Sequence, residues 1–261
     1  MRRKGAALHI GFPDIYPSYA IPVLAALLVG LLYPVARHIT DRHKRRRYYE
    51  LQLITFLSAI VGAKLVFLFG EYGWPFRPVD DWQEILYSGR SIVGALIFGL
   101  LGAELAKPLV GYSLPPNDRF AALLPFSFAV GRVGCLISGC CRGTPTNSPL
   151  AIVYSDGIPR HPVQLYEILF HVLAGCVGIV LVKKKLFRGC VFSLYLIAYG
   201  AFRLVTETIR ETPQSFGLLS TYQWLSLVMM ALGGGFLLKR MRYPSEAWKS
   251  YFAGDAASAT R

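Results

Sequence analysis

Long apolar runs separated by short polar segments extend along the whole chain. A helix needs about 20 mostly apolar residues to cross a bilayer, and windows of about this length recur seven times. This pattern predicts an all-α integral membrane protein, a bundle of seven transmembrane helices that forms one domain over residues 1–261. Its larger outward loops are expected near residues 71–90 and 138–163. The windows span residues 20–36, 51–70, 92–110, 120–137, 163–182, 190–206 and 217–238.

The composition agrees with this interpretation and narrows the class of partner. The chain is 54% hydrophobic and only 16% charged, and its mean hydropathy is +0.42, which does not describe a soluble surface. Its net charge of +13 comes mostly from short clusters of Lys and Arg between the apolar runs. Clusters in that position attract anionic lipid head groups. We therefore expect membrane lipids as partners and no nucleic acid.

The distribution of Lys and Arg among the loops predicts the orientation. With the N-terminus outside, the segments that face inward hold seventeen Lys and Arg residues, whereas those that face outward hold eight. Loops rich in Lys and Arg stay in the cytoplasm, so the sequence predicts an outside N-terminus and a cytoplasmic C-terminus. The inward segments are residues 37–50, 107–119, 183–189 and the tail from residue 239.

Three basic residues fall within or at the ends of predicted spans, namely Lys64, Arg132 and Arg203. A basic side chain at bilayer depth costs about 2.5–3.5 kcal/mol on insertion scales, so each needs a partner or a function. Lys64 could instead extend its apolar stem along the helix and place its charge at the interface.

Arg132 lies in the first of three polar segments, residues 131–143, at the outer end of the fourth predicted span. Its arginines offer forked donors that suit a phosphate, and its glycines permit close approach of backbones or a head group. Packing of helices through Gly131, Gly134 and Gly139 is the alternative, although it does not explain Arg132.

The other two segments, residues 160–167 and 199–210, border the fifth and sixth predicted spans. In the first of them, His161 enters the span from outside, and Gln164 and Glu167 lie one helical turn apart. The other segment carries Arg203, Glu207 and Arg210 at spacings that form one stripe on a helix. This stripe predicts either a salt-bridged helix end or a cationic clamp for an anionic head group.

Three cysteines, Cys135, Cys140 and Cys141, lie close to one another in the first segment. Their spacing matches no usual metal-binding pair, so neither a metal nor another cofactor is expected. A disulfide is permitted if this loop faces outward. A membrane thiol oxidoreductase that uses Cys140 and Cys141 is a rival hypothesis, but nothing else in the sequence indicates a quinone or a partner dithiol.

Taken together, the three segments resemble signature segments of the bacterial prolipoprotein diacylglyceryl transferases. Residues 131–143 resemble a signature that begins Gly-Arg and ends in Gly, and residues 160–167 resemble Arg-His-Pro-Ser-Gln-Leu-Tyr-Glu. Residues 199–210 resemble Tyr-Gly-x-x-Arg-x-x-x-Glu-x-x-Arg, and the last span region carries a Gln, here Gln223. Order and spacing agree over about 80 residues.

This resemblance implies transfer of a diacylglyceryl group from phosphatidylglycerol to the lipobox cysteine of a precursor protein, with release of glycerol phosphate, in the bacterial inner membrane. Arg132 and Arg203 would bind the phosphate, and Glu207 would position Arg203 and Arg210. His161 completes the catalytic candidates as a proton acceptor. The substrate-binding candidates are Arg210, Gly143, Gln164, Tyr199 and Tyr19.

The chain departs from the family pattern at several positions. Val93 stands where the family has a histidine in its third span, and Lys64 replaces an arginine of the second. Three family positions, two Asn and one Glu, are here Cys135, Ser138 and Cys140. A divergent paralogue that acts on another lipid or acceptor is therefore an alternative. Without the family histidine, either His161 accepts the thiol proton, or the field of the arginines lowers the thiol pKa and water carries the proton. A third, less favoured route uses Cys135 or Cys140 as an intermediate nucleophile.

Overall fold

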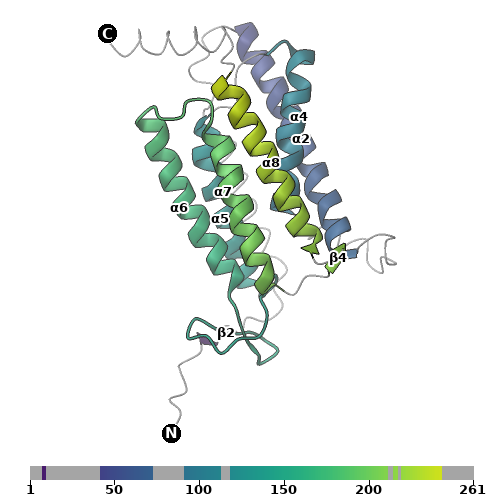
Figure 1. Cartoon of the computed structure of the whole chain (residues 1–261), viewed down its shortest axis with the longest axis vertical. Helices are drawn as coiled ribbons and strands as arrows, with labels where there is room; N and C mark the ends of the chain where they lie inside the picture. Colours follow the sequence, from purple (N-terminus) through teal and green to yellow (C-terminus); the bar gives the residue numbers. More distant parts are fainter. Residues whose placement is uncertain are drawn as a thin grey trace.

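Six long helices form a bundle in the part of the chain that the computed structural model describes (Figure 1). The structure describes residues 8–9, 42–72, 91–112, 118–210, 214–216 and 219–242. The predicted span 20–36 and Tyr19 therefore lie outside the described residues. The helices are α2 (Arg42–Tyr72), α4 (Ile92–Val110), α5 (Asp118–Ile137), α6 (Val163–Lys183), α7 (Val191–Thr206) and α8 (Thr221–Arg242).

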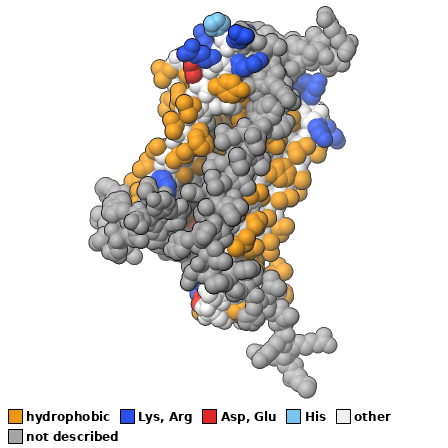
Figure 2. Space-filling model, turned by 180° about the vertical axis from the view of Figure 1, so that it is seen from behind, with side chains coloured by type: hydrophobic (Ala, Val, Ile, Leu, Met, Phe, Trp, Pro, Cys, Tyr) orange, Lys and Arg blue, Asp and Glu red, His pale blue; other side chains and the backbone are white. Residues whose placement is uncertain are grey.

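Five of these helices, all except α7, are long and apolar enough to cross a membrane. Large apolar side chains on their outer faces are exposed, for example Leu57 on α2 and Leu173 on α6. Figure 2 shows such hydrophobic side chains along the flanks of the bundle. The chain is thus a multi-pass helical membrane protein. The count of seven spans and the orientation of the termini stay predictions.

Small residues let consecutive helices pack closely, as is usual where no hydrophobic force drives helices together. The helices associate as the pairs α2–α4, α5–α6 and α7–α8. A side chain at Gly94 of α4 would overlap the backbone of Gly62 in α2. Between α7 and α8, a Cβ atom at Gly200 would lie 3.0 Å from the carbonyl oxygen of Ser226. Glycine is therefore required where these backbones approach.

Short strands lie at one end of the bundle (Figure 1). One small sheet has β2 (Ile152–Val153) between β1 (Leu8–His9), which is parallel to it, and β3 (Pro159–Arg160), which is antiparallel. Strands β2 and β3 belong to the predicted outward loop 138–163, whereas β1 comes from the N-terminal segment. The second sheet pairs β4 (Gln214–Phe216) with β5 (Leu219–Ser220) directly before α8.

Polar contacts tie the helices together at the opposite end. Asp118 accepts hydrogen bonds from the backbone N–H groups of Gly189 (2.5 Å) and Val191 (3.2 Å). Arg240 donates to the carbonyl oxygen of Gly189 at 3.1 Å and to Glu104 at 3.1 Å. Glu104 also binds Lys107 at 2.5 Å. Glu104 and Lys107 are the charged residues within the predicted span 92–110, and they therefore have partners in α4 and α8.

Labelling from one side of the membrane tests the orientation. The basic residues that begin α2 and end α8 lie at the same end of the bundle, at the top of Figure 1. We expect this end to be cytoplasmic because clusters of Lys and Arg resist export. In a Cys140→Ser background, an impermeant maleimide should label Asp156→Cys in intact cells and Lys44→Cys only after permeabilisation. Labelling of Lys44→Cys in intact cells would reverse the orientation.

Candidate active site

A cluster of buried charged side chains lies near the end of the bundle that carries the small sheets. It combines Arg132 of α5, Glu167 of α6 and Arg203 of α7 with two residues that follow α7. Those two are Glu207, in the 3-10 helix η2 (Glu207–Ile209), and Arg210 directly after it. Residues far apart in the sequence are thereby brought into one ionic network.

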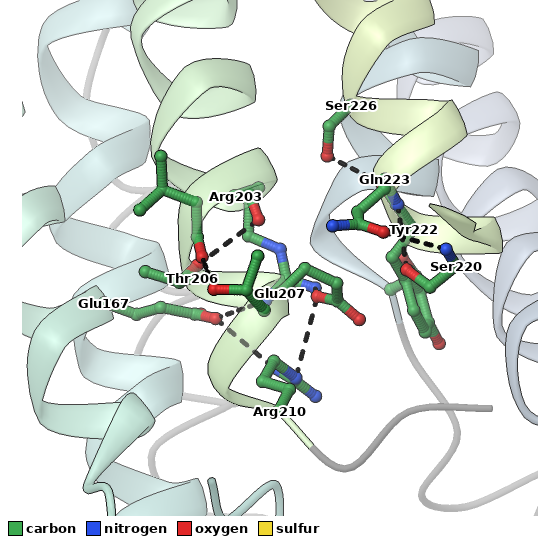
Figure 3. A network of polar contacts seen from close by, with 12 residues as sticks. Glu167, Arg203, Thr206, Glu207, Arg210, Ser220, Tyr222, Gln223 and Ser226 are labelled. Carbon is green, nitrogen blue, oxygen red and sulfur yellow. Dashed lines mark hydrogen bonds and ion pairs between the residues drawn. The ribbon is translucent and has the colours of Figure 1, made fainter. Parts of the chain in front are cut away.

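Glu167 is the centre of this network. Its side chain is 0% exposed, and its carboxylate forms ion pairs with three arginines. Nη1 of Arg203 lies 2.7 Å from Oε1, Nη1 of Arg210 lies 3.4 Å from the same oxygen, and Nε of Arg132 pairs with Oε2. Figure 3 shows Arg203 and Arg210 converging on Glu167 from the end of α7. One carboxylate thus binds guanidinium groups from two other helices and the segment after α7.

Glu207 provides the second carboxylate of the cluster. Its Oε2 atom lies 2.6 Å from Nη2 of Arg203 and 3.8 Å from Nε of Arg210. The guanidinium group of Arg203 also lies over the ring of Tyr222, 5.7 Å from the ring centroid. Arg203 is therefore held on three sides, by α6, by η2 and by α8.

The expectation of a single helical stripe through Arg203, Glu207 and Arg210 is wrong. The α-helix ends at Thr206 and tightens into η2, and Arg210 has an extended backbone with φ −106° and ψ 149°. Its segment pairs with the loop at Gly143 in an isolated β-bridge. This turn away from the helix axis directs Arg210 toward Glu167 of the neighbouring helix α6.

The network carries one excess positive charge and has spare donors. Three arginines face two carboxylates, Glu167 and Glu207, so the net charge is +1 when the nearby thiols are protonated. The Nε atoms of Arg203 and Arg210 are buried and make no hydrogen bond within the described part of the chain. Buried N–H donors beside excess positive charge favour the binding of an anion.

The side chains of the three arginines are largely enclosed. Those of Arg132, Arg203 and Arg210 are 12%, 3% and 9% exposed. Such burial is tolerable because each arginine shares a carboxylate with another. Arg132 is the most accessible of the three.

Gly143 joins the loop to the arginine segment. Its N–H donates to the carbonyl oxygen of His161 at 3.0 Å, and the N–H of Thr144 donates to that of Ile209 at 2.9 Å. A Cβ atom at Gly143 would lie 2.7 Å from both the Cβ of His161 and the oxygen of Ile209. Only glycine fits between these two segments without a shift of the backbone.

Gln164 and His161 contact the loop rather than the arginines in the described part of the chain. The buried amide of Gln164 accepts a hydrogen bond from the Tyr154 hydroxyl at 2.9 Å and donates to the carbonyl oxygen of Cys140. The Nδ1 atom of His161 lies 3.3 Å from the Tyr166 hydroxyl. Gln164 therefore holds the start of the loop 138–163 in place, and His161 lies at the end of the same loop.

Tyr199 is completely buried and belongs to the same apolar core cluster as Val93. Its ring packs against that of His171, with the centroids 4.7 Å apart. His171 is also completely buried, with Nδ1 3.1 Å from the Tyr195 hydroxyl, and its Nε2 makes no hydrogen bond within the described residues.

Sequence reasoning missed two buried polar residues of this region. It placed Glu167 on a common face with Gln164 but gave it no role, and it did not select His171. A usable signal was present, because His171 is a lone imidazole inside the apolar run 163–182, one turn after Glu167.

The turn after α5 brings three thiols together. The sulfur atoms of Cys135, Cys140 and Cys141 all lie within 4.8 Å of one another. Hydrogen bonds from the other two thiols, together with the charges of Arg210 and Arg132, lower the pKa of the Cys141 thiol.

Helix packing through Gly131 is not found, because a Cβ atom there would meet nothing within 4 Å.

Gln223 stabilises the start of α8. Its Oε1 atom accepts a hydrogen bond from the N–H of Ser220 at 2.9 Å, and its own N–H donates to Oγ of Ser220 at 3.1 Å. This reciprocal pair is a capping box, and the neighbouring Tyr222 has its ring centroid 5.7 Å from the guanidinium carbon of Arg203.

Comparison with known proteins gives matches over most of the chain. The profile of a family described as prolipoprotein diacylglyceryl transferase matches residues 6–239. A phosphatidylglycerol–prolipoprotein diacylglyceryl transferase of Bordetella bronchiseptica is 32% identical over 267 residues, which cover 90% of this chain and 98% of that protein. A Nitrosomonas europaea protein of the same name is 33% identical, over 74% of this chain and 73% of its own. For phosphatidylglycerol–prolipoprotein diacylglyceryl transferase 2 of Clostridium perfringens the identity is 27%, over 85% and 89%.

Proposed function

The chain belongs to the prolipoprotein diacylglyceryl transferase family, and on this premise we propose that it transfers a diacylglyceryl group from phosphatidylglycerol to a cysteine thiol of a prolipoprotein. The acceptor is the lipobox cysteine of an exported precursor. Membrane lipids and such precursors are the partners, and nucleic acid is not among them.

The observation that carries this proposal is the buried arginine cluster with one excess positive charge. Phosphatidylglycerol carries one negative charge on its phosphodiester. In the transfer, the acceptor sulfur bonds to the glyceryl CH2 carbon, the bond from that carbon to the phosphate oxygen breaks, and the electron pair leaves with glycerol phosphate. Negative charge therefore grows on the phosphate, where fixed cationic donors in a dry site stabilise it most.

The contacts support a separate role for each charged residue. Arg132 and Arg203 come from different helices and reach the same carboxylate, so they could grip a phosphate from two directions. Arg210 and Arg203 each keep a buried Nε–H without a hydrogen bond, and these donors would bind phosphate oxygens. Glu167 and Glu207 would act as positioning residues that fix the planes of the guanidinium groups.

The position of the cluster agrees with an acceptor that arrives after export. It lies near the end of the bundle opposite the basic termini of α2 and α8 (Figure 1). If the basic end is cytoplasmic, the cluster faces the outer leaflet. We place the protein accordingly in the bacterial cytoplasmic membrane, where exported precursors emerge.

A direct transfer assay tests the function. Purified protein is incubated with phosphatidylglycerol vesicles and a synthetic lipobox peptide, and the peptide is analysed by mass spectrometry. We expect a diacylglyceryl adduct on the cysteine and an equal amount of released glycerol phosphate. A peptide with serine in place of the cysteine and vesicles of phosphatidylethanolamine serve as controls. Absence of the adduct, while a relative is active in the same assay, would refute the proposal.

His161 is the proposed acceptor of the thiol proton in place of the family histidine. Its ring is half-buried, and its backbone holds Gly143, which pairs with the Arg210 segment. A well-placed general base contributes about 10²–10⁴-fold, so the His161→Ala variant should lose that factor in transfer rate. Tyr166→Phe removes only the hydrogen bond to the ring, and this variant should keep most of its transfer rate. An unchanged rate in His161→Ala would favour the field of the arginines, with water as proton carrier.

A further inference from the structure

Three cysteines lie close together in the turn where the chain leaves the C-terminal end of α5. Cys135 is buried, Cys140 is exposed, Cys141 is half-buried, and none of them is in a disulfide. The turn is closed by a hydrogen bond from the N–H of Cys140 to the carbonyl oxygen of Cys135, at 3.2 Å. Cys141 has φ +57°, a left-handed conformation that is uncommon for a residue with a Cβ atom. This backbone places all three sulfur atoms within 4.8 Å of one another.

We propose that Cys135, Cys140 and Cys141 form a trithiolate site for a thiophilic metal ion of the zinc(II) class. Zinc binds cysteine sulfur at about 2.3 Å, which puts the ligand sulfurs of a tetrahedral site about 3.8 Å apart. The present separations, up to 4.8 Å, require only small side-chain rotations to reach that geometry. The spacing of the cysteines in the sequence does not predict this arrangement. The left-handed turn at Cys141 creates it, whereas a usual metal site has its ligands at regular spacings.

Polar contacts surround the three sulfur atoms, and zinc binds the thiolate form of cysteine. Nη1 of Arg132 lies 3.8 Å from the sulfur of Cys135. The hydroxyl of Ser138 donates to the sulfur of Cys140 at 3.3 Å. Such outer contacts orient metal ligands. Formation of three sulfur–zinc bonds releases up to three protons to the solvent.

Exposure of Cys140 gives the ion a path from solvent and leaves the fourth coordination position to water. The bound ion would join the end of α5 to the residues just before Gly143. Because Gly143 pairs with Arg210, the ion would hold the loop against the arginine segment. The site is thus distinct from the phosphate cluster but adjoins it.

Metal analysis of the purified protein tests the site without any activity measurement. The full-length protein is reduced, loaded with zinc sulfate, freed of excess metal and analysed for zinc per chain. We expect about one zinc ion per chain, and none in the triple variant Cys135→Ser, Cys140→Ser, Cys141→Ser. The matched control replaces the other two cysteines, Cys176 and Cys190, and should keep its zinc. Equal zinc in the parent and the triple variant, or none in the parent, would overturn the proposal.

Alkylation of the unmodified protein provides a measurement that does not depend on how the variants fold. Zinc should slow maleimide labelling of Cys140 at least tenfold and leave Cys176, which is exposed on α6, unaffected. Labelling of Cys140 at the same rate with and without zinc would contradict the site. A disulfide between two of the three cysteines that persists in the presence of zinc would replace the metal site with a redox pair.

Discussion

Replacement of Glu167 by glutamine is expected to cause the largest loss of stability of any single polar substitution considered for this protein. Three guanidinium groups converge on this fully buried carboxylate. Glutamine keeps the shape but removes the charge, which leaves three buried cations with Glu207 alone. Loss of one partner of a buried ion pair costs about 3–5 kcal/mol, and transfer activity should fall with it because the arginines lose their orientation. Thermal unfolding in lipid nanodiscs and the peptide assay measure the two effects.

Asp156→Asn is the matched control for this experiment. Asp156 also pairs with two arginines, Arg142 at 2.8 Å and Arg160 at 3.1 Å, but it lies in an exposed loop. Solvent screens such pairs, so the unfolding midpoint should hardly change. Equal shifts of the midpoint in Glu167→Gln and Asp156→Asn would mean that burial of the network does not decide its contribution.

The substitution Arg203→Lys should be nearly as harmful to transfer as Arg203→Ala. Arg203 bridges Glu167 at 2.7 Å and Glu207 at 2.6 Å through two different nitrogens and covers the ring of Tyr222. A lysine ammonium is a point charge and cannot reproduce this planar fork. Loss of one well-placed donor to a developing anion typically lowers kcat about 10²–10³-fold. We expect both variants to lose about 10²–10³-fold in kcat/KM and to differ from each other by less than tenfold.

An exposed pair of the same spacing supplies the comparison. Arg46 binds Glu50 at 2.8 Å, also four residues apart, but the Arg46 side chain is 81% exposed. Arg46→Lys should transfer at the rate of the parent protein. If Arg203→Lys also does so, charge alone is sufficient at this position and the forked clamp is wrong.

Arg132 and Arg203 could be selected from the sequence because charged residues inside apolar runs are costly and therefore need an explanation. Glu207 could be selected because it follows Arg203 by four residues, about one helical turn. Those three residues do lie in one ionic network. Glu167 also lies within a predicted span, 163–182, but the sequence indicated only a common face with Gln164 and no role. Its importance follows from the packing of α5, α6 and α7, which directs three arginines to it.

The sequence also did not predict the conformation of the segment around Arg210. Helical spacing predicted one continuous stripe, but the helix ends at Thr206 and Arg210 is extended against the loop at Gly143. Periodicity describes neighbours on one helix and contains no information on contacts between a helix end and a distant loop.

The sequence by itself determined the class of protein, the apolar helices and the resemblance of three polar segments to one family. These features are local, since hydropathy, charge in a window and motif spacing are all read within about 20 residues. Only the tertiary structure decided that Glu167 is the common partner of three arginines and that Cys135, Cys140 and Cys141 bring their sulfurs together. Both features depend on backbone geometry, on close helix packing in one case and on a left-handed turn in the other, and residue spacing alone specifies neither.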